Sequence, residues 1–207
     1  MSAGNIARLL DLGVPIGPAA ELLELPPGCS ALAGLLERKN GLFAFESALH
    51  IYGAVSQPEG VHDLISWNEP DLWRSEFSLS HDPVFFAQDI FGGQFGLLND
   101  GSVVSLNPET GELHPMGSDL EAWAGALLDD WDFVTGHTYA RAWQQNNGAL
   151  PMGQRLYPKT HFVFGGAYEA ANLFACDAAV AMRSYANVAE QIRGLPDGAR
   201  VRWQVVD

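Results

Sequence analysis

The chain has 207 residues, of which 47% are hydrophobic, and its formal net charge is −14. A chain of this length buries roughly 70% of the surface of its unfolded state, so neither a disulfide nor a metal ion is needed for stability. Nucleic-acid binding requires Lys and Arg to replace the counterions of the phosphates, so this acidity excludes a nucleic-acid partner and favours a basic protein partner.

The acidic residues are concentrated in the middle of the chain. Between positions 40 and 140 there are 16 acidic residues and one basic residue, Arg74, whereas positions 151–207 hold five acids and six bases. A negative field of this size accelerates encounter with a cationic surface toward ~10⁸ M⁻¹s⁻¹ at low salt, and it is screened over about 8 Å at physiological ionic strength. The other interpretation is that the acidity only provides solubility.

No segment predicts export or membrane insertion. The first ten residues lack the basic start and the apolar stretch of a signal peptide. No window reaches the ~18 consecutive apolar residues of a membrane span. Cys29 and Cys176 are far apart and lie outside any CxxC or CxxH pattern. We therefore expect free thiols in a reducing, cytoplasmic compartment.

The N-terminal third predicts helices followed by two strands. Ile6, Leu9 and Leu10 are spaced as a short amphipathic helix, which Pro15 and Pro18 interrupt before a resumption over 19–23. A second helix is predicted over 30–39, and Asn40-Gly41 ends it. Strands are then expected over 43–45 and 49–55, and one or two short helices over 61–77.

The middle of the chain predicts a meander of three antiparallel strands. Hydrophobic residues alternate over 84–90, 94–98 and 103–106. Asn-Asp-Gly at 99–101 and the run at 107–111 supply residues that tolerate the positive φ of tight turns. Ser118 and Glu121 have the spacing of a capping box, which predicts a helix over 119–129 with Ser118 as its N-cap.

The last third predicts further helices and a closing strand. Helical spacing is expected over 133–145 and 177–193, with a strand over 169–174 between them. Alternation of Val201, Trp203 and Val205 with polar residues indicates a final strand. No long linker or low-complexity tract separates this part, so we expect it to pack onto the preceding body.

The sequence contains no recognisable catalytic or metal-binding motif. Its six histidines lack ligand spacings, and there is no GxSxG, GxxxxGK[ST] or GxGxxG. Asp89 and Asp100 could form an acid/base pair, but turn and strand-edge roles explain them better. Cys29 is interpreted as a buried structural thiol. We therefore assign no catalytic residue, no metal and no cofactor.

Two acidic segments are candidates for contact with a partner protein. Asp129, Asp130 and Asp132 form a dense carboxylate group, for which a weak ion site and a solvated surface are the alternatives. Trp67 and Trp73 are interleaved with Glu69 and Asp71, the composition of a hot spot for a Lys- or Arg-rich partner. For each Trp a core position remains the favoured alternative.

Part of the sequence resembles a known superfamily. The matching residues, in order, are Leu25-Pro26-Pro27-Gly28, Asn40-Gly41, Phe43-Ala44-Phe45, Ala48-Leu49-His50-Ile51-Tyr52, Asp89-Ile90-Phe91-Gly92-Gly93-Gln94-Phe95, Asp100-Gly101, Glu109-Thr110-Gly111-Glu112 and Leu120-Glu121-Ala122-Trp123. In this order they resemble the SUKH superfamily, which includes the Smi/Knr cell-wall regulators and many bacterial immunity proteins for secreted polymorphic toxins. The resemblance covers residues 25–131, and its specificity comes from the order of the pieces.

These observations together predict one α+β domain over residues 1–207. We expect a mixed, largely antiparallel sheet wrapped by helices, with a core at about 25–150 and a C-terminal helix and strand extension at 151–207. The resemblance implies a non-enzymatic protein that neutralises a toxin domain by binding it. A regulatory scaffold of the cell-wall-regulator type and a hydrolase with a dispersed site are the alternatives. The oligomeric state is left open.

Overall fold

The computed structural model describes residues 4–18, 25, 29–54, 57–196 and 198–199. The strands are β1 (Val14–Pro15), β2 (Leu42–Ala44), β3 (Leu49–Ile51), β4 (Val84–Gln88), β5 (Gln94–Leu97), β6 (Val103–Asn107), β7 (Glu112–Gly117), β8 (Gln154–Pro158) and β9 (Leu173–Asp177). The α-helices are α1 (Asn5–Leu12), α2 (Ser30–Arg38), α3 (Leu64–Trp67), α4 (Leu120–Asp129), α5 (Trp131–Thr135), α6 (His137–Asn147) and α7 (Ala178–Ile192). Short 3-10 helices are η1 (Arg74–Glu76), η2 (Phe162–Phe164) and η3 (Ala170–Asn172). The helical resumption expected over 19–23 and the strand expected at 201–205 lie outside the described residues.

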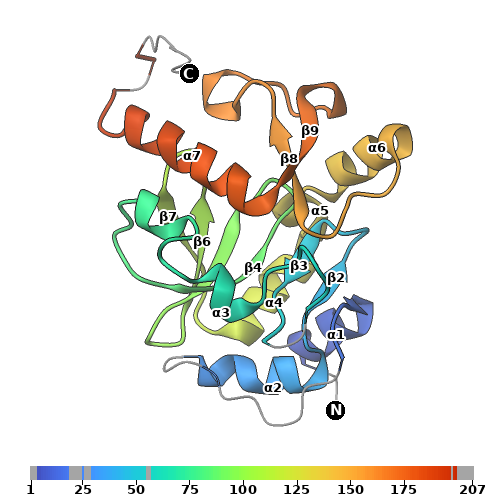
Figure 1. The fold of residues 1–207 in the computed structure, drawn as a ribbon. Helices are drawn as coiled ribbons and strands as arrows, with labels where there is room; N and C mark the ends of the chain where they lie inside the picture. Colours follow the sequence, from blue (N-terminus) through green and yellow to red (C-terminus); the bar gives the residue numbers. More distant parts are fainter. Residues whose placement is uncertain (1–3, 19–24, 26–28, 55–56, 197, 200–207) are drawn as a thin grey trace.

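The fold is α+β, as expected. Seven strands follow one another across the main sheet in chain order, from β1 to β7, and β8 and β9 form a separate hairpin. Every pairing in both sheets is antiparallel, so the expected mixed character is absent from the described strands. The helix α7 follows the hairpin directly, which gives the C-terminal extension a hairpin and a helix (Figure 1).

Helices cover both faces of the main sheet. On one face Phe86 and Phe95 contact Trp123 of α4, with ring centroids 4.9 and 5.6 Å apart. On the other face Phe85 contacts Trp73 at 5.3 Å. Figure 1 shows α4 behind the sheet and α7 in front of it. Because both faces are covered, β2, β3 and β5 are buried along their whole length and lack the alternation of a half-exposed sheet.

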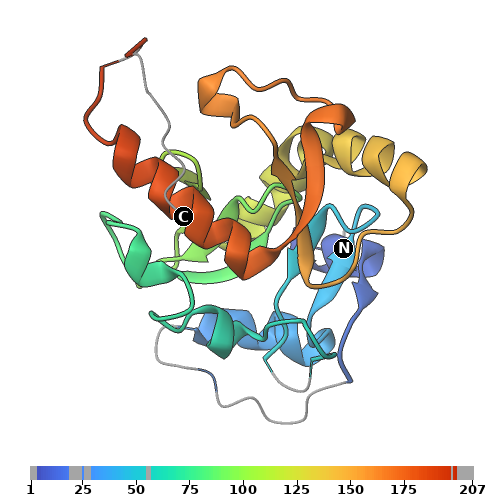
Figure 2. The same cartoon turned by 45° about the horizontal axis from the view of Figure 1, so that its top comes forward.

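The C-terminal extension packs on the front face of the sheet. Asp177 caps α7 by accepting hydrogen bonds from the backbone of Ala179 and Val180. Met182 and Tyr185 of α7 are buried and belong to the same hydrophobic cluster as the strands. Figure 2 shows α7 running across the strands, beside the β8–β9 hairpin. The extension therefore completes the core rather than standing apart from it.

Three consecutive residues with positive φ form the turn between β2 and β3. Phe45, Glu46 and Ser47 have φ of 52°, 53° and 70°, a conformation that costs a non-glycine residue about 1–2 kcal/mol. Tertiary contacts hold it: Phe45 stacks on Trp131 at 5.0 Å, and Gln144 donates to the Glu46 carbonyl. The turn is thus fixed against α5 and α6.

Two predicted helix ends differ from the structure. Asp119, not Ser118, caps α4 by accepting a hydrogen bond from the Ala122 backbone. The expected partner Glu121 instead accepts from the Asn5 backbone at 2.7 Å and so ties α4 to α1. The helix expected over 133–145 is two helices, because Gly136 adopts φ of 69° between α5 and α6.

Candidate functional site

The structure places Trp67 and Trp73 in the core. Their exposed fractions are 1% and 0%, so the prediction that they contact a partner is wrong and the alternative core assignment is right. Burial is possible because each indole N–H has an acceptor: Trp67 donates to Gln94 Oε1 at 2.8 Å and Trp73 to the Trp67 carbonyl at 3.0 Å. Glu69 and Asp71 lie between them on an exposed loop. The two tryptophans therefore anchor that acidic loop without contributing to its surface.

Asp129, Asp130 and Asp132 are all exposed, at the end of α4 and in α5. Asp132 accepts hydrogen bonds from the backbone and hydroxyl of Thr138, which lower its pKa. Among the described residues Asp129 and Asp130 form no ion pair. Phe133 beside them is 84% exposed, although sequence reasoning did not select it. This acidic end of α4 and α5 combines free carboxylates with an exposed aromatic ring.

The two acidic segments do not converge on one site. Glu69 and Asp71 follow α3, which lies in front of the sheet in Figure 1, whereas α4 and α5 lie behind it. A wide hollow of about 270 Å³ adjoins the first segment and is lined by Pro70, Arg74, Ser75, Phe77, Leu79 and Asp82. Arg74 and Asp82 form an ion pair there. Its described lining residues include no second titratable pair that could serve acid/base catalysis.

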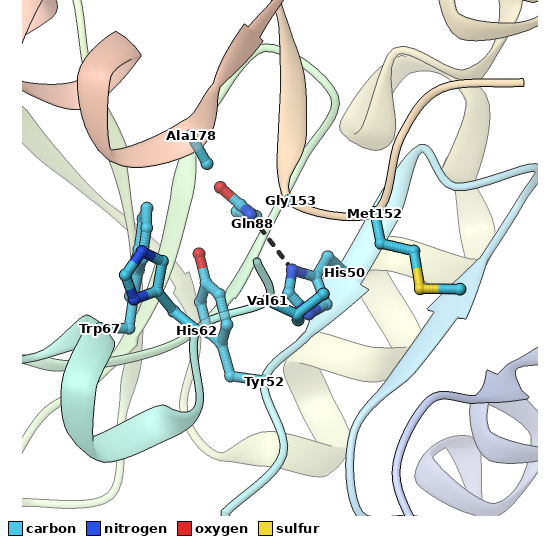
Figure 3. A pocket seen from close by; sticks show the side chains of 9 residues that line it. All are labelled: His50, Tyr52, Val61, His62, Trp67, Gln88, Met152, Gly153 and Ala178. Atoms are coloured by element: carbon cyan, nitrogen blue, oxygen red, sulfur yellow. Dashed lines mark hydrogen bonds between the residues drawn. The ribbon is translucent and has the colours of Figure 1, made fainter. Parts of the chain in front are cut away.

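A polar cluster of His50, Tyr52, Gln88 and Arg155 is buried between the sheet and the extension, and each member is at most 2% exposed. Figure 3 shows three of its members, His50, Tyr52 and Gln88. His50 Nδ1 lies 3.2 Å from the Gln88 amide, which in its alternative orientation also accepts from Arg155 Nε at 3.1 Å. Burial lowers the pKa of His50 well below its usual value, and Arg155 and His62 lower it further. His50 is therefore neutral, and the one cation of the group is the Arg155 guanidinium.

The cavity beside this cluster is too small for a substrate. Its volume is about 10 Å³, and its lining residues are His50, Tyr52, Val61, His62, Trp67, Gln88, Met152, Gly153 and Ala178 (Figure 3). A water molecule requires roughly 10–15 Å³ by this measure, whereas a pocket for an organic ligand has roughly 300 Å³ or more. Among the described residues His50 Nε2 has no hydrogen-bond partner, whereas the other polar groups of the cluster bond to one another and link the extension to the sheet.

Asp89 shapes the turn between β4 and β5. Its Oδ1 accepts hydrogen bonds from the backbone of Phe91 and Gly93, both at 2.8 Å, and Gly92 between them has φ of 87°. Although the residue keeps some exposed surface, protein atoms surround its carboxylate, and this burial raises the pKa to about 7. The turn role expected from the sequence is present. The near-neutral pKa was not expected.

A chain of hydrogen bonds joins the sheet to the C-terminal hairpin. Glu109, 4% exposed, accepts from His161 Nδ1 at 3.1 Å, and His161 Nε2 lies 3.0 Å from the Tyr157 hydroxyl. That hydroxyl also contacts Ser184 Oγ at 2.7 Å. The order of groups resembles a catalytic relay, but burial raises the pKa of Tyr157, which keeps its hydroxyl protonated and a poor nucleophile. No spacing in the sequence indicates that His161 contacts Glu109.

The described residues contain no group of three or more His, Cys, Asp or Glu placed to hold a metal ion. Cys29 is buried and Cys176 is partly exposed, and both are free thiols. None of the described helices has both the length and the apolar character needed to cross a membrane.

Comparison with known proteins reveals a shared fold. Protein-family models give no match to the sequence, and neither do the curated proteins. Among solved structures, the fold is similar to the crystal structure of Atu4351 from Agrobacterium tumefaciens, with a TM-score of 0.54 and 15% sequence identity. The match covers 86% of this chain and 86% of that chain. At this identity the similarity concerns the arrangement of the elements alone.

Proposed function

We propose that this protein is a non-enzymatic binding module that acts in the cytoplasm on a basic protein partner. From the sequence resemblance we further propose that it is a SUKH-type immunity protein and that the partner is a toxin domain. Neutralisation would then be steric and electrostatic, by covering the surface that the toxin needs. A specific complex of this kind buries roughly 800 Å² on each side.

The observation that carries the proposal is the unneutralised acidic surface. Most of the acidic residues between positions 40 and 140 are exposed, and Arg74, the one cation there, is paired with Asp82. Asp129 and Asp130 form no ion pair with any described residue. Carboxylates held close together without cations repel one another, and a cationic partner removes that repulsion.

The buried sites support binding rather than catalysis. The polar cluster of His50, Tyr52 and Arg155 adjoins a cavity of about 10 Å³, too small for a metabolite. Asp89 has a near-neutral pKa, but its carboxylate is engaged by two backbone N–H groups of its own turn. Perturbed groups of this kind also occur in purely structural networks.

The resemblance gains support from the physical roles of its residues. Asp89 and Gly92 form the β4–β5 turn, and Gln94 accepts the Trp67 indole N–H in the core. Glu109 holds the C-terminal hairpin. At these positions the fold itself requires particular side chains. A superfamily whose members bind different partners would share such structural residues rather than contact residues.

The direct test is to search the neighbouring genes for a toxin domain and to coexpress this chain with any such domain. We expect rescue of growth and a complex that survives about 150 mM salt. The double variant Asp129→Lys/Asp130→Lys should slow association about 10-fold at low salt, and the loss should shrink as salt rises. Glu37→Lys/Glu59→Lys is the matched control, since it makes the same change of charge at two exposed residues in other segments. Unchanged toxicity together with no complex would refute the proposal.

A further inference from the structure

Four aromatic rings from three distant segments meet at the surface. Phe91 follows β4, Tyr139 belongs to α6, and Phe162 and Tyr168 lie between β8 and β9. Phe91 contacts Tyr139, Phe162 and Tyr168 with ring centroids 5.8, 5.3 and 6.0 Å apart. Phe162 and Tyr168 stack in parallel at 3.8 Å and 4°. We call these four residues the surface aromatic cluster; Figure 2 shows its α6 beside the segment that joins β8 and β9.

The cluster exposes one ring on a fixed support. Tyr168 is 56% exposed, and Phe162 covers one face of its ring. The segment below is held by Glu109, which accepts from the backbone of Phe162 at 3.0 Å and of Val163 at 2.8 Å. Asn172 adds a hydrogen bond to the Ala167 carbonyl at 3.0 Å. An aromatic side chain held in this way loses little entropy when a partner binds.

Two carboxylates lie beside the cluster, because Glu109 accepts a hydrogen bond from the Phe162 backbone and Asp89 accepts one from the Phe91 backbone. Burial raises the pKa of Tyr168, and the charges of Glu109 and Asp89 raise it further, so both carboxylates are close enough to act on the ring. The cation–π contacts of the described residues involve Phe85 and Phe43, not this cluster. An electron-rich ring face with carboxylates behind it attracts a cation.

We propose that the surface aromatic cluster is the docking point for an arginine side chain of the protein partner, stacked on the exposed part of the Tyr168 ring. This inference rests on the proposed function, which makes the partner basic. It assigns a contact site that lies outside the two acidic segments predicted from the sequence. Arginine fits better than lysine because its planar, weakly hydrated guanidinium stacks on a ring. Tyr is also among the residues enriched in binding hot spots.

The test is an NMR titration of the full chain with the peptide Ac-Gly-Arg-Gly-NH₂ at about 150 mM salt. Ac-Gly-Cit-Gly-NH₂ is the matched control, because citrulline keeps the shape and removes the charge. We expect saturable shifts centred on Tyr168, Phe162 and Tyr139 with the arginine peptide and weaker shifts with the citrulline peptide. Tyr168→Ala should raise the dissociation constant about 3- to 30-fold, and Tyr168→Phe should preserve binding.

Phe174→Ala is the control variant, since Phe174 is a 41% exposed ring on β9 outside the cluster. It should leave the titration unchanged. The inference is overturned if no saturable shifts occur, if the citrulline peptide binds equally, if the shifts lie at Asp129 and Asp130 instead, or if Tyr168→Ala binds like the wild type. Failure of coexpression with a toxin would refute the immunity proposal and leave this titration unaffected.

Discussion

Replacing Glu109 by Gln tests whether this buried carboxylate holds the C-terminal hairpin on the sheet. Glu109 Oε1 accepts from His161 Nδ1 at 3.1 Å and from the Phe162 backbone at 3.0 Å, and Oε2 accepts from the Val163 backbone at 2.8 Å. All three neighbours are donors, so a Gln amide must turn its own N–H₂ toward at least one of them. Each buried donor left without an acceptor costs about 1–3 kcal/mol, and two donors then face each other. We expect a loss of about 2–5 kcal/mol.

Urea unfolding measures that loss. With an m-value of about 2 kcal/mol/M, the midpoint should fall by about 1–2.5 M. Hydrogen exchange should show lost protection at the Phe162 and Val163 amides. The matched control is Glu112→Gln, in the β6–β7 hairpin that also contains Glu109. The Glu112 side chain is 67% exposed, so this variant should change stability by less than about 0.5 kcal/mol. If Glu109→Gln also stays within about 0.5 kcal/mol of wild type, the hydrogen bonds of Glu109 do not stabilise the packing of the C-terminal hairpin on the sheet.

Three further predictions concern stability. Because the pKa of Asp89 is raised to about 7, the folded chain retains a proton that the unfolded chain releases near pH 4, and stability should fall as the pH rises from about 4 to 7. In thermal melts Asp89→Asn should flatten this pH dependence of stability. An unchanged pH dependence would contradict the raised pKa of Asp89. In denaturant unfolding Trp73→Ala should lower the free energy of unfolding by about 3–5 kcal/mol, because its side chain is buried. Phe133→Ala should lower it by less than about 0.5 kcal/mol, because Phe133 is exposed, and equal effects would contradict this difference in burial. Gly136→Ala should lower the free energy of unfolding by about 1–3 kcal/mol, because the new Cβ would lie 2.6 Å from Phe91 Cε2 and the backbone there has φ of 69°. Calorimetry measures this loss, and an unchanged melting temperature would exclude the strain.

The sequence predicted elements well where local pattern decides them. Alternation identified β4, β5 and β6, and α7 begins at Ala178, one residue after the expected start. The strand β7 was missed because its Pro115 is atypical of a strand, although Pro is tolerated at a sheet edge. The N-cap of α4 was misplaced because Glu121, the expected capping partner, bonds to the distant Asn5. Errors thus arise where a long-range contact replaces a local one.

The candidate site was less predictable for the same reason. Trp67 and Trp73 stand in a polar stretch, and only the distant acceptor on Gln94 and the carbonyl of Trp67 itself explain how both indoles are buried. The surface aromatic cluster joins Phe91 to Tyr168, residues with no spacing relationship in the sequence. Composition correctly placed Asp129, Asp130 and Asp132 at the surface, because carboxylates without cations are rarely buried.

The chain order of the strands also governs how the molecule can assemble during synthesis. Each strand from β2 to β7 pairs with the strand made just before it, so the sheet can grow as the ribosome releases the chain. Arg155, Met182 and Tyr185 emerge only after the last strand of the sheet, and until then the surface around Tyr52 and Gln94 is covered by Trp67 but not by these three residues. A nascent chain that stalls before α7 would therefore expose an aromatic surface, and translation of the final third is the step at which aggregation has to be avoided.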